Sequence, residues 1–288
     1  MNSADQLREL LAGQDILAVP GCYDAISAKL IERAGFPATF MGGFGVSASR
    51  IGMPDTGLIS YAEMLDQGRN ICNAVSFPVF GDGDTGYGNA MNVQRTVKGY
   101  AQTGFACIMI EDQVSPKRCG HTRGKQTVSR EEAFARIKAA VDVRDAGTDI
   151  LIMARTDANG TEGLNEAIFR AEKFAEIGAD ITFLEAPRNE EEMRAYCSRV
   201  PGPKMANMVE QGVTPVLPPS ELREIGYKIV AYPLTLILAG IRAMESALSS
   251  LRREESPRTL AEFSHLREII GFPEYYEAEK KYAADRAV

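Results

Sequence analysis

Residues 78–90 read PVFGDGDTGYGNA, a short apolar run that ends in acidic and glycine residues before an amphipathic segment begins. The same unit recurs along the chain. Its apolar runs lack polar alternation, which is typical of parallel strands that are covered on both faces. The eight expected strands are Ile16–Gly21, Ala38–Gly43, Pro78–Asp84, Cys107–Asp112, Asp149–Asp157, Ile181–Pro187, Lys204–Val209 and Lys228–Pro233.

The segments between these runs carry helix signals. We expect Ser129 with Glu132 to form a capping box before a helix that Gly147 ends, and Leu164–Glu176 to form a helix that ends at Gly178. We expect Ser220 to cap a helix that stops at Gly226. Ser3 with Gln6 should cap a leading helix before Gly13. Eight strand–helix alternations favour a (β/α)8 TIM-type barrel over a doubly wound sheet. We expect one barrel domain over residues 1–288, in which 242–288 form a C-terminal helical extension, either solvated or an oligomer contact.

Composition excludes several classes of function. The 288 residues hold 32 Lys and Arg against 39 Asp and Glu, a net charge of −7. An acidic chain without a basic block is poorly suited to nucleic acid. The longest apolar stretch, Ile229–Ile241, is too short to span a membrane, and the N-terminus has no signal-peptide pattern. Five scattered cysteines indicate reduced thiols, and two histidines make a histidine-rich zinc site unexpected. We therefore expect a cytoplasmic protein with no nucleic-acid or membrane partner.

Polar residues gather at the carboxyl ends of the expected strands, where barrel enzymes carry their chemistry. They are Asp24, Gly42, Gly43, Asp82, Asp84, Glu111, Asp112, Arg155, Asp157, Glu185 and Asn207.

The segment GDGDTGYGN at 81–89 formally satisfies a dinucleotide-binding GxGxxG pattern. Its two aspartates would face the pyrophosphate, which is unfavourable, and no acidic residue follows at the expected offset. An EF-hand loop also fails, because Tyr87 replaces the turn glycine and Val93 the final glutamate. We interpret Asp82 and Asp84, with Glu111 from the next strand, as ligands of Mg²⁺ or Mn²⁺. The alternative is an Asx-rich turn.

The segment KRCGHTRGK at 117–125 surrounds Cys119 with four cations and one histidine. Such a setting favours the thiolate. We interpret Cys119 as a catalytic acid, base or nucleophile on a closing lid; the alternative is a basic surface loop.

Two further groups fit a carboxylate-binding site. Arg155 can grip a carboxylate bidentately, although a structural salt bridge to Glu185 or Glu111 explains it about as well. Glu185 and Asn207 lie on the same expected rim and would bind a substrate carboxylate or orient the arginine. The alternative is that they only stabilise the loops at the strand ends.

Seven motifs lie along almost the whole chain. They are PGCYDA at 20–25, GMPD at 52–55, GDGDTGYGNA at 81–90, EDQ at 111–113, KRCGH at 117–121, ARTDA at 154–158 and ANMVEQGVTP at 206–215. On these motifs the chain resembles the isocitrate lyase / phosphoenolpyruvate mutase superfamily. Within it, the chain looks closest to the group of 2-methylisocitrate lyase, 2,3-dimethylmalate lyase and petal death protein.

The resemblance implies a homotetramer of barrels whose last helix is swapped with a neighbour. It implies Mg²⁺ held at Asp82, Asp84, Asp55 and Glu111, directly or through water, and substrate contacts at Gly42, Gly43, Phe44, Gly120, His121 and Asn207, with Arg155 and Glu185 completing the pocket. Cys119 matches the thiol that protonates the departing carbanion. The implied reaction is carbon–carbon cleavage of a small 2-hydroxy dicarboxylate, of the 2,3-dimethylmalate or 2-methylisocitrate type, to a 2-oxo acid such as pyruvate plus a carboxylate.

Two departures from the family pattern bear on the substrate. Leu238 aligns with an arginine that binds a third carboxylate in the 2-methylisocitrate lyases, and Phe40 replaces a tyrosine. A buried carboxylate without a partner costs several kcal/mol, so a smaller dicarboxylate is favoured. The alternatives are an oxaloacetate hydrolase or decarboxylase, a carboxyphosphonoenolpyruvate phosphonomutase-type enzyme, and a barrel that binds a dicarboxylate without catalysis.

Overall fold

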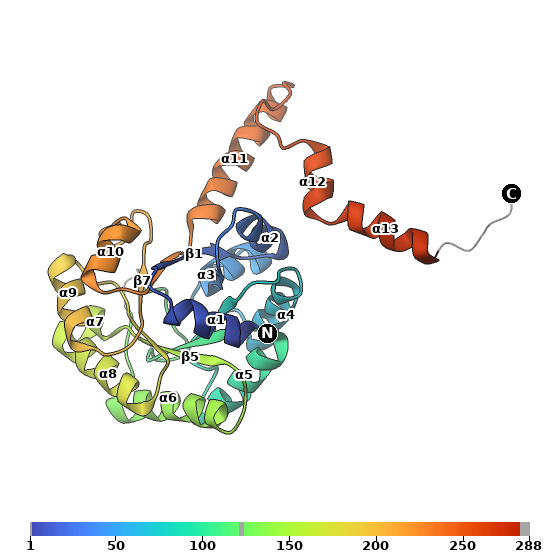
Figure 1. Ribbon diagram of the computed structural model, residues 1–288. Coiled ribbons are helices and arrows are strands. Elements are labelled where there is room, and N and C mark those ends of the chain that lie inside the picture. The colour runs from blue at the N-terminus through green and yellow to red at the C-terminus, as the bar shows by residue number, and fades with distance from the viewer. Residues whose placement is uncertain (1, 121–123, 283–288) are drawn as a thin grey trace, which may run out of the picture. The chain divides into compact units, whose positions relative to one another are not determined.

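The computed structural model describes residues 2–120 and 124–282, and it contains a closed barrel of eight parallel strands ringed by helices (Figure 1). Each strand pairs with the next along the chain, and the last pairs with the first. The strands are β1 (Leu17–Cys22), β2 (Thr39–Met41), β3 (Val79–Asp82), β4 (Cys107–Glu111), β5 (Leu151–Thr156), β6 (Ile181–Leu184), β7 (Lys204–Asn207) and β8 (Ile229–Tyr232). All eight strand predictions and the predicted TIM-type barrel are confirmed.

Most helices connect successive strands and lie around the barrel, whereas α1 precedes β1. They are α1 (Ser3–Ala12), α2 (Ala25–Arg33), α3 (Gly43–Val46), the π-helical turn η1 (Ser47–Ile51), α4 (Tyr61–Cys72), α5 (Ala90–Thr103), α6 (Arg130–Asp145), α7 (Ala158–Thr161), α8 (Leu164–Ile177), α9 (Glu190–Arg199) and α10 (Pro219–Ile225).

Four of these helices test the predicted end signals. Gly178, at a φ of 112°, ends α8 as predicted. Ser129 caps α6, but the reciprocal half of the capping box is missing because the Glu132 carboxylate accepts from Arg136 instead. The other two caps were predicted wrongly, since each serine lies inside its helix: Asn2 caps α1 through the Asp5 amide, and Pro219 opens α10 after Pro218.

The barrel interior is packed with side chains from the strands, and α1 contributes to it. Leu7 and Ala4 of α1 are buried in the same apolar cluster as Phe80, Met153 and other inward-facing strand residues. The helix therefore covers the amino end of the barrel and leaves the carboxyl end for a site.

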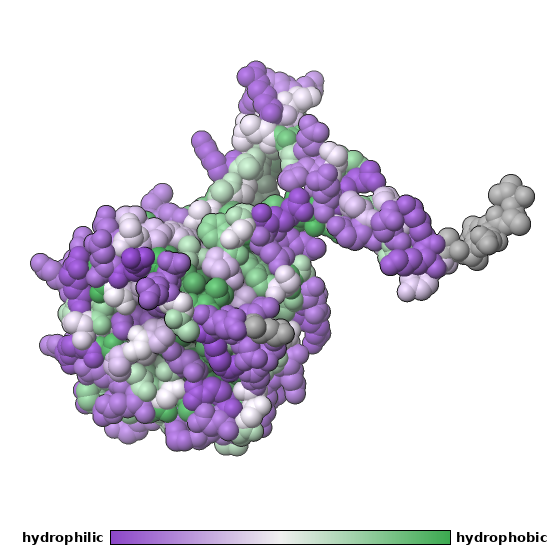
Figure 2. All heavy atoms as spheres, viewed as in Figure 1, coloured by the Kyte–Doolittle hydropathy of each residue, from purple (hydrophilic) through white to green (hydrophobic). Residues whose placement is uncertain are grey.

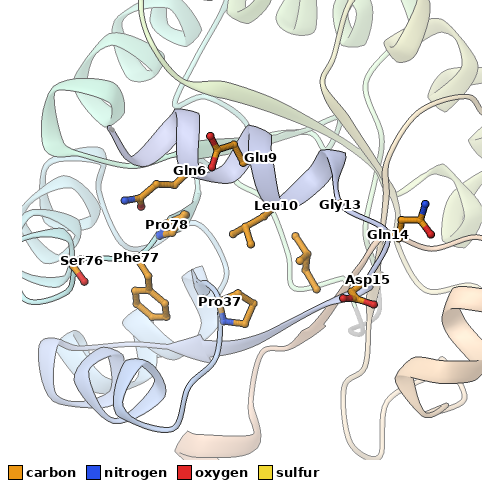
Figure 3. A pocket seen from close by; sticks show the side chains of 11 residues that line it. Gln6, Glu9, Leu10, Gly13, Gln14, Asp15, Pro37, Ser76, Phe77 and Pro78 are labelled. Atoms are coloured by element: carbon orange, nitrogen blue, oxygen red, sulfur yellow. The ribbon is translucent and has the colours of Figure 1, made fainter.

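A cavity of about 550 Å³ lies at that amino end, under α1 (Figure 3). Gln6, Glu9 and Leu10 of α1 border it on one side, and Pro37 and Phe77, from the segments that enter β2 and β3, lie opposite. It is larger than the cavity at the carboxyl end, but none of the predicted site residues lines it. Chemistry in this fold belongs to the carboxyl ends of the strands, so we place the candidate site there.

The chain divides into two compact units, Met1–Leu236 and Ile237–Val288. The second unit contains most of α11 (Thr235–Arg252), then α12 (Phe263–Ile269) and α13 (Phe272–Tyr282). In the described residues, no helix is both long and apolar enough to cross a membrane.

Candidate active site

The GDGDTG loop is joined to the neighbouring strand by backbone hydrogen bonds. The amide of Gly83 donates to Met109 O (2.9 Å), and the amide of Glu111 donates to Asp84 O (2.9 Å). A Cβ at position 83 would lie 2.7 Å from Met109 O, so only glycine allows this approach. The loop thereby carries Asp82 and Asp84 to the side of Glu111.

Lys117 lies among the acids that the sequence assigns to a metal. Its ammonium is 2.7 Å from both carboxylate oxygens of Asp55 and 2.9 Å from Asp84 Oδ1. Asp82 has a different partner, since its Oδ2 accepts a hydrogen bond from the amide of Gly43 (2.8 Å). These three aspartates and Glu111 are all buried. One lysine therefore neutralises part of a strongly acidic group.

Burial and mutual repulsion perturb these acids. Burial, followed by the charges of Asp82 and Asp55, raises the pKa of Asp84 to about 6 against the opposing effect of Lys117. Burial likewise raises the pKa of Glu111 well above its ordinary range, although Arg155 and Lys117 lower it. Burial lowers the pKa of Lys117, but the surrounding carboxylates outweigh it and hold the pKa well above the usual value.

The acids fit a hard divalent cation by their chemistry. The donors are all carboxylate oxygens, which suit Mg²⁺ or Mn²⁺. Glu111 Oε1 is buried and, within the described residues, has no hydrogen-bonding partner. No three His, Cys, Asp or Glu side chains in the described ranges form a ready-made metal cluster, so a metal held here would rely on bound waters or on a shift of Lys117.

Arg155, at the end of β5, is the centre of a second buried group. Its Nε lies 2.8 Å from Asp157 Oδ2 and 3.3 Å from Glu111 Oε2, and its Nη2 lies 3.1 Å from Glu185 Oε2. Burial opposes the charge, but Asp157 and then Glu185 and Glu111 raise the pKa of Arg155 well above its ordinary value. The structural salt bridges that the sequence left open are therefore present. They position the guanidinium at the edge of a cavity.

A cavity of about 190 Å³ opens among the carboxyl ends of the strands. Among the described residues that line it, Arg155 is the only cationic side chain. Its polar and glycine lining consists of Gly42, Gly43, Asp82, Cys119, Gly120, Arg155, Glu185 and Asn207. Its apolar lining consists of Phe40, Phe44, Met109, Phe183, Met205, Val209, Ala231, Pro233 and Leu234. The cavity thus has a charged side and a broad apolar wall.

Most predicted site residues converge on this cavity or on its acidic border. Asn207 Nδ2 is 3.4 Å from Glu185 Oε2, a long contact. Asp55, Asp84 and Glu111 do not line the cavity, and the first two share the ammonium of Lys117. His121 lies outside the described residues, so its predicted substrate contact stays a prediction. Asp24, noted for its place at a strand end, caps α2.

The sequence gives Lys117, Lys125 and Asp157 no individual role, and it predicts both lysines only as cations around Cys119. In the structure, the ammonium of Lys117 contacts the carboxylates of Asp55 and Asp84, and that of Lys125 contacts Asp157. Asp157 was visible only as a polar residue at a strand end. A lysine in a loop gives no sequence signal of which distant carboxylate it meets.

Comparisons with known proteins match nearly the whole chain. A family model described as phosphoenolpyruvate phosphomutase matches residues 7–252. The 2,3-dimethylmalate lyase of Eubacterium barkeri is 44% identical over 290 residues, which cover 99% of this chain and 100% of that protein.

Two solved structures extend the comparison. A structure of oxaloacetate acetylhydrolase in complex with the inhibitor 3,3-difluorooxalacetate has a TM-score of 0.95 and 33% identity, over 99% of this chain and 98% of that chain. Phosphonopyruvate hydrolase in complex with oxalate and Mg²⁺ has a TM-score of 0.87 and 29% identity, over 98% of this chain and 99% of that chain.

Proposed function

Because the chain belongs to the phosphoenolpyruvate phosphomutase family of the PEP mutase/isocitrate lyase superfamily, we propose that it cleaves the C2–C3 bond of a small 2-hydroxy dicarboxylate. The products are a 2-oxo acid such as pyruvate and a second carboxylate. The enzyme is a carbon–carbon lyase. The substrate is of the 2,3-dimethylmalate or 2-methylisocitrate type.

The observation that carries this proposal is the composition of the cavity. Cys119 and Gly120 line the same 190 Å³ space as Arg155, Asp82 and Glu185. A thiol, a guanidinium and two carboxyl groups are the parts that retro-aldol cleavage of a hydroxy acid requires: a proton donor, an anion stabiliser and a proton acceptor.

The residues divide the reaction as follows. Glu185, which lines the cavity, accepts the C2 hydroxyl proton, and the C2–O bond becomes a carbonyl as the C2–C3 bond breaks. The electron pair passes to C3 and its carboxylate, where Arg155 stabilises the charge. Cys119 Sγ then delivers a proton to C3, which completes the second product.

A divalent cation, Mg²⁺ or Mn²⁺, belongs to this proposal. Asp82, Asp84, Asp55 and Glu111 would hold it, directly or through water. When bound, such an ion acidifies a coordinated hydroxyl and polarises a carbonyl oxygen. The buried Glu111 Oε1 supports it, as does the Mg²⁺ in the phosphonopyruvate hydrolase complex.

The apolar wall and the small volume bear on substrate size. The cavity is smaller than ordinary ligand pockets of roughly 300–1,000 Å³. Apolar side chains such as Val209 and Leu234 suit methyl groups. Among the described lining residues, a third carboxylate would find one cation, Arg155, which three acids already share. We therefore favour 2,3-dimethylmalate over 2-methylisocitrate as the better substrate.

The test is turnover of a panel of acids with Mg²⁺, read by product mass. The panel holds 2,3-dimethylmalate, 2-methylisocitrate, oxaloacetate and carboxyphosphonoenolpyruvate. We expect the first acid to be cleaved fastest and Cys119→Ser to lower its kcat at least about 100-fold, in line with the usual contribution of a general acid. Undiminished turnover by the variant would remove Cys119 from the role, and no turnover of any acid by the wild type would leave the barrel a dicarboxylate binder.

An oxaloacetate hydrolase is the second candidate, because the oxaloacetate acetylhydrolase structure matches the chain with a TM-score of 0.95. Oxalate plus acetate from oxaloacetate would identify it, and pyruvate plus CO₂ would identify a decarboxylase. A phosphonomutase would show itself by ³¹P NMR of the phosphonate product.

The location and assembly remain part of the same proposal. The described cysteines are all free thiols, which suits a cytoplasmic enzyme. The family resemblance also supports a homotetramer with a swapped C-terminal helix.

A further inference from the structure

Lys125 makes two contacts that link the segment carrying Cys119 to the buried charges. Its Nζ donates to Gly120 O (2.5 Å) and lies 3.1 Å from Asp157 Oδ1. The side chain is only 7% exposed. Lys125 does not line the 190 Å³ cavity that Cys119 and Arg155 share, and with Gly120 it lines a separate hollow beside it.

Asp157 is fixed on its other side. Its amide donates to Asp112 Oδ1 (2.8 Å), and the Asp112 carboxylate also accepts from Thr156 and Arg170. The two oxygens of Asp157 accept from Arg155 Nε (2.8 Å) and Nη2 (3.0 Å). Asp157 is fully buried. One carboxylate therefore orients the catalytic guanidinium and receives Lys125.

Gly120 also lies directly against the catalytic groups. A Cβ at this position would be 2.5 Å from Arg155 Nη2 and 2.6 Å from Glu185 Cγ. Gly160, in α7, leaves room for the lysine in a similar way, because a Cβ there would lie 3.1 Å from Lys125 Nζ. Gly120 therefore meets Arg155 in two ways. It lies directly against the guanidinium, and its carbonyl oxygen is linked to Arg155 through Lys125 and Asp157.

We infer that Lys125 and Asp157 form a positioning pair that holds the Cys119–Gly120 backbone against the guanidinium of Arg155. The pair sets where the thiol lies relative to the anion-stabilising group. Without the ammonium of Lys125, Gly120 O loses its hydrogen-bond donor. Asp157 keeps Arg155 as its cationic partner, but the link from Arg155 through Asp157 to Gly120 is broken. The catalytic consequence rests on the proposed function, since misplacement of a proton donor by about 1 Å costs about 100-fold in rate.

The kinetic test compares Lys125→Met, Lys125→Arg and a control, Lys138→Met, on the best acid of the panel. Lys138 is exposed, pairs with Asp142 on its own helix and does not line the cavity. We expect Lys125→Met to lower kcat 30- to 100-fold with KM changed less than about threefold, Lys125→Arg to recover most of the loss, and Lys138→Met to match the wild type.

A second measurement does not depend on turnover. Hydrogen exchange by mass spectrometry reports peptides that contain Cys119 and Gly120. We expect at least fivefold faster exchange there in Lys125→Met, while peptides from the barrel strands exchange at the wild-type rate. If the wild type cleaves none of the acids, the proposed function fails, and this comparison still decides the positioning role.

Two results would overturn the inference. One is a kcat for Lys125→Met within threefold of the wild type. The other is faster exchange spread evenly over the barrel strands, which a merely structural lysine would produce. If Lys125→Met does not fold, Lys125→Gln, which keeps a polar side chain but lacks the ammonium, is measured in the same way and judged by the same two results.

Discussion

Lys117 shows how a single buried cation holds an acidic group together. Its ammonium contacts Asp55 and Asp84, and the side chain is 5% exposed. Removing one partner of a buried ion pair leaves uncompensated charge, at a cost of about 3–5 kcal/mol. We expect Lys117→Met to lower the free energy of unfolding by that amount in EDTA. Mg²⁺ should restore part of the loss, because a divalent cation supplies the missing positive charge.

The measurement is urea unfolding of wild type and Lys117→Met, each in EDTA and in excess Mg²⁺. Lys138→Met, which removes an exposed charge, is expected to change stability by less than about 0.5 kcal/mol in either condition. If Mg²⁺ changes the stability of Lys117→Met no more than that of the control, the assignment of the acids to a metal is wrong.

The sequence predicts which residues lie at the site, but it does not predict which side chains they contact. Asp82, Arg155 and Asn207 lie in the last two residues of their strands and Glu185 directly follows one, so the barrel topology alone brings them to one rim. Contacts across the rim depend on loop conformation. Lys117 meets Asp55, which is 62 positions away, and no local pattern encodes that distance.

At the scale of elements, Glu166 of α8 joins two arginines. It accepts from Arg170 Nε in its own helix (2.8 Å) and from Arg130 Nε at the start of α6 (2.9 Å). The hydrogen bond from Arg130 and then that from Arg170 lower the pKa of Glu166 to about 2, although burial opposes them. The side chain is 13% exposed. The carboxylate therefore ties α6 to α8 only while it is ionised.

This pKa sets the pH range of the stabilisation. The folded-state pKa lies below the ordinary value of 4.5, so the contribution is complete above that pH and is lost as pH falls toward about 2. We expect Glu166→Gln to lower the free energy of unfolding by about 2 kcal/mol at pH 7. The difference should shrink to less than half at pH 3, as measured by urea unfolding at both values.

The matched control is Glu176→Gln, whose exposed carboxylate pairs with Lys173 within the same helix. Its effect should stay below about 0.5 kcal/mol at both pH values. An equal effect of Glu166→Gln at pH 7 and pH 3 would contradict a depressed pKa.

Gly68 of α4 allows that helix to approach the barrel closely. A Cβ at this position would lie 2.4 Å from the ring of Phe105, which is buried and stacks on Tyr100 at 4.8 Å. Alanine gains about 1 kcal/mol of helix propensity, but overpacking costs about 1–3 kcal/mol. Because the ring is held on its other face, we expect Gly68→Ala to destabilise the protein by about 1–2 kcal/mol in urea unfolding.

A double-variant cycle separates the two contributions. Phe105→Leu removes the ring, so Gly68→Ala should be much less destabilising in that background. If the cost is the same in both backgrounds, the contact with Phe105 is not its cause.

The strands were easier to predict than the helix caps, and the reason is physical. A covered parallel strand such as β4 is apolar up to its final residue, Glu111, so its composition identifies it. A cap depends on one side chain. Asn2 and Ser3 both have the chemistry of a cap, and only the backbone conformation decides that Asn2 accepts from the Asp5 amide.

At the scale of the whole molecule, the C-terminal unit leaves apolar side chains without cover. The exposed residues of α11 recur at helical spacing, and much of the helix is pale green to white in Figure 2: Leu238, Ile241, Met244, Leu248 and Leu251. Contiguous exposed apolar surface marks an interaction site. Together with the family resemblance, this face supports the proposed assembly of four copies through their C-terminal helices.

The prediction is that charge on this face prevents assembly. Leu248→Glu places a carboxylate at a site that the proposed tetramer would bury, where an unpaired charge costs several kcal/mol, and it should shift the protein to smaller species in light scattering coupled to size exclusion. Ser246→Glu adds the same charge to the opposite face of α11 and should remain as large as the wild type. Because the barrel core lies within Met1–Leu236, far-UV circular dichroism of Leu248→Glu should stay close to that of the wild type. A wild type that elutes as a monomer, or a Leu248→Glu variant that still forms tetramers, would refute assembly through this face.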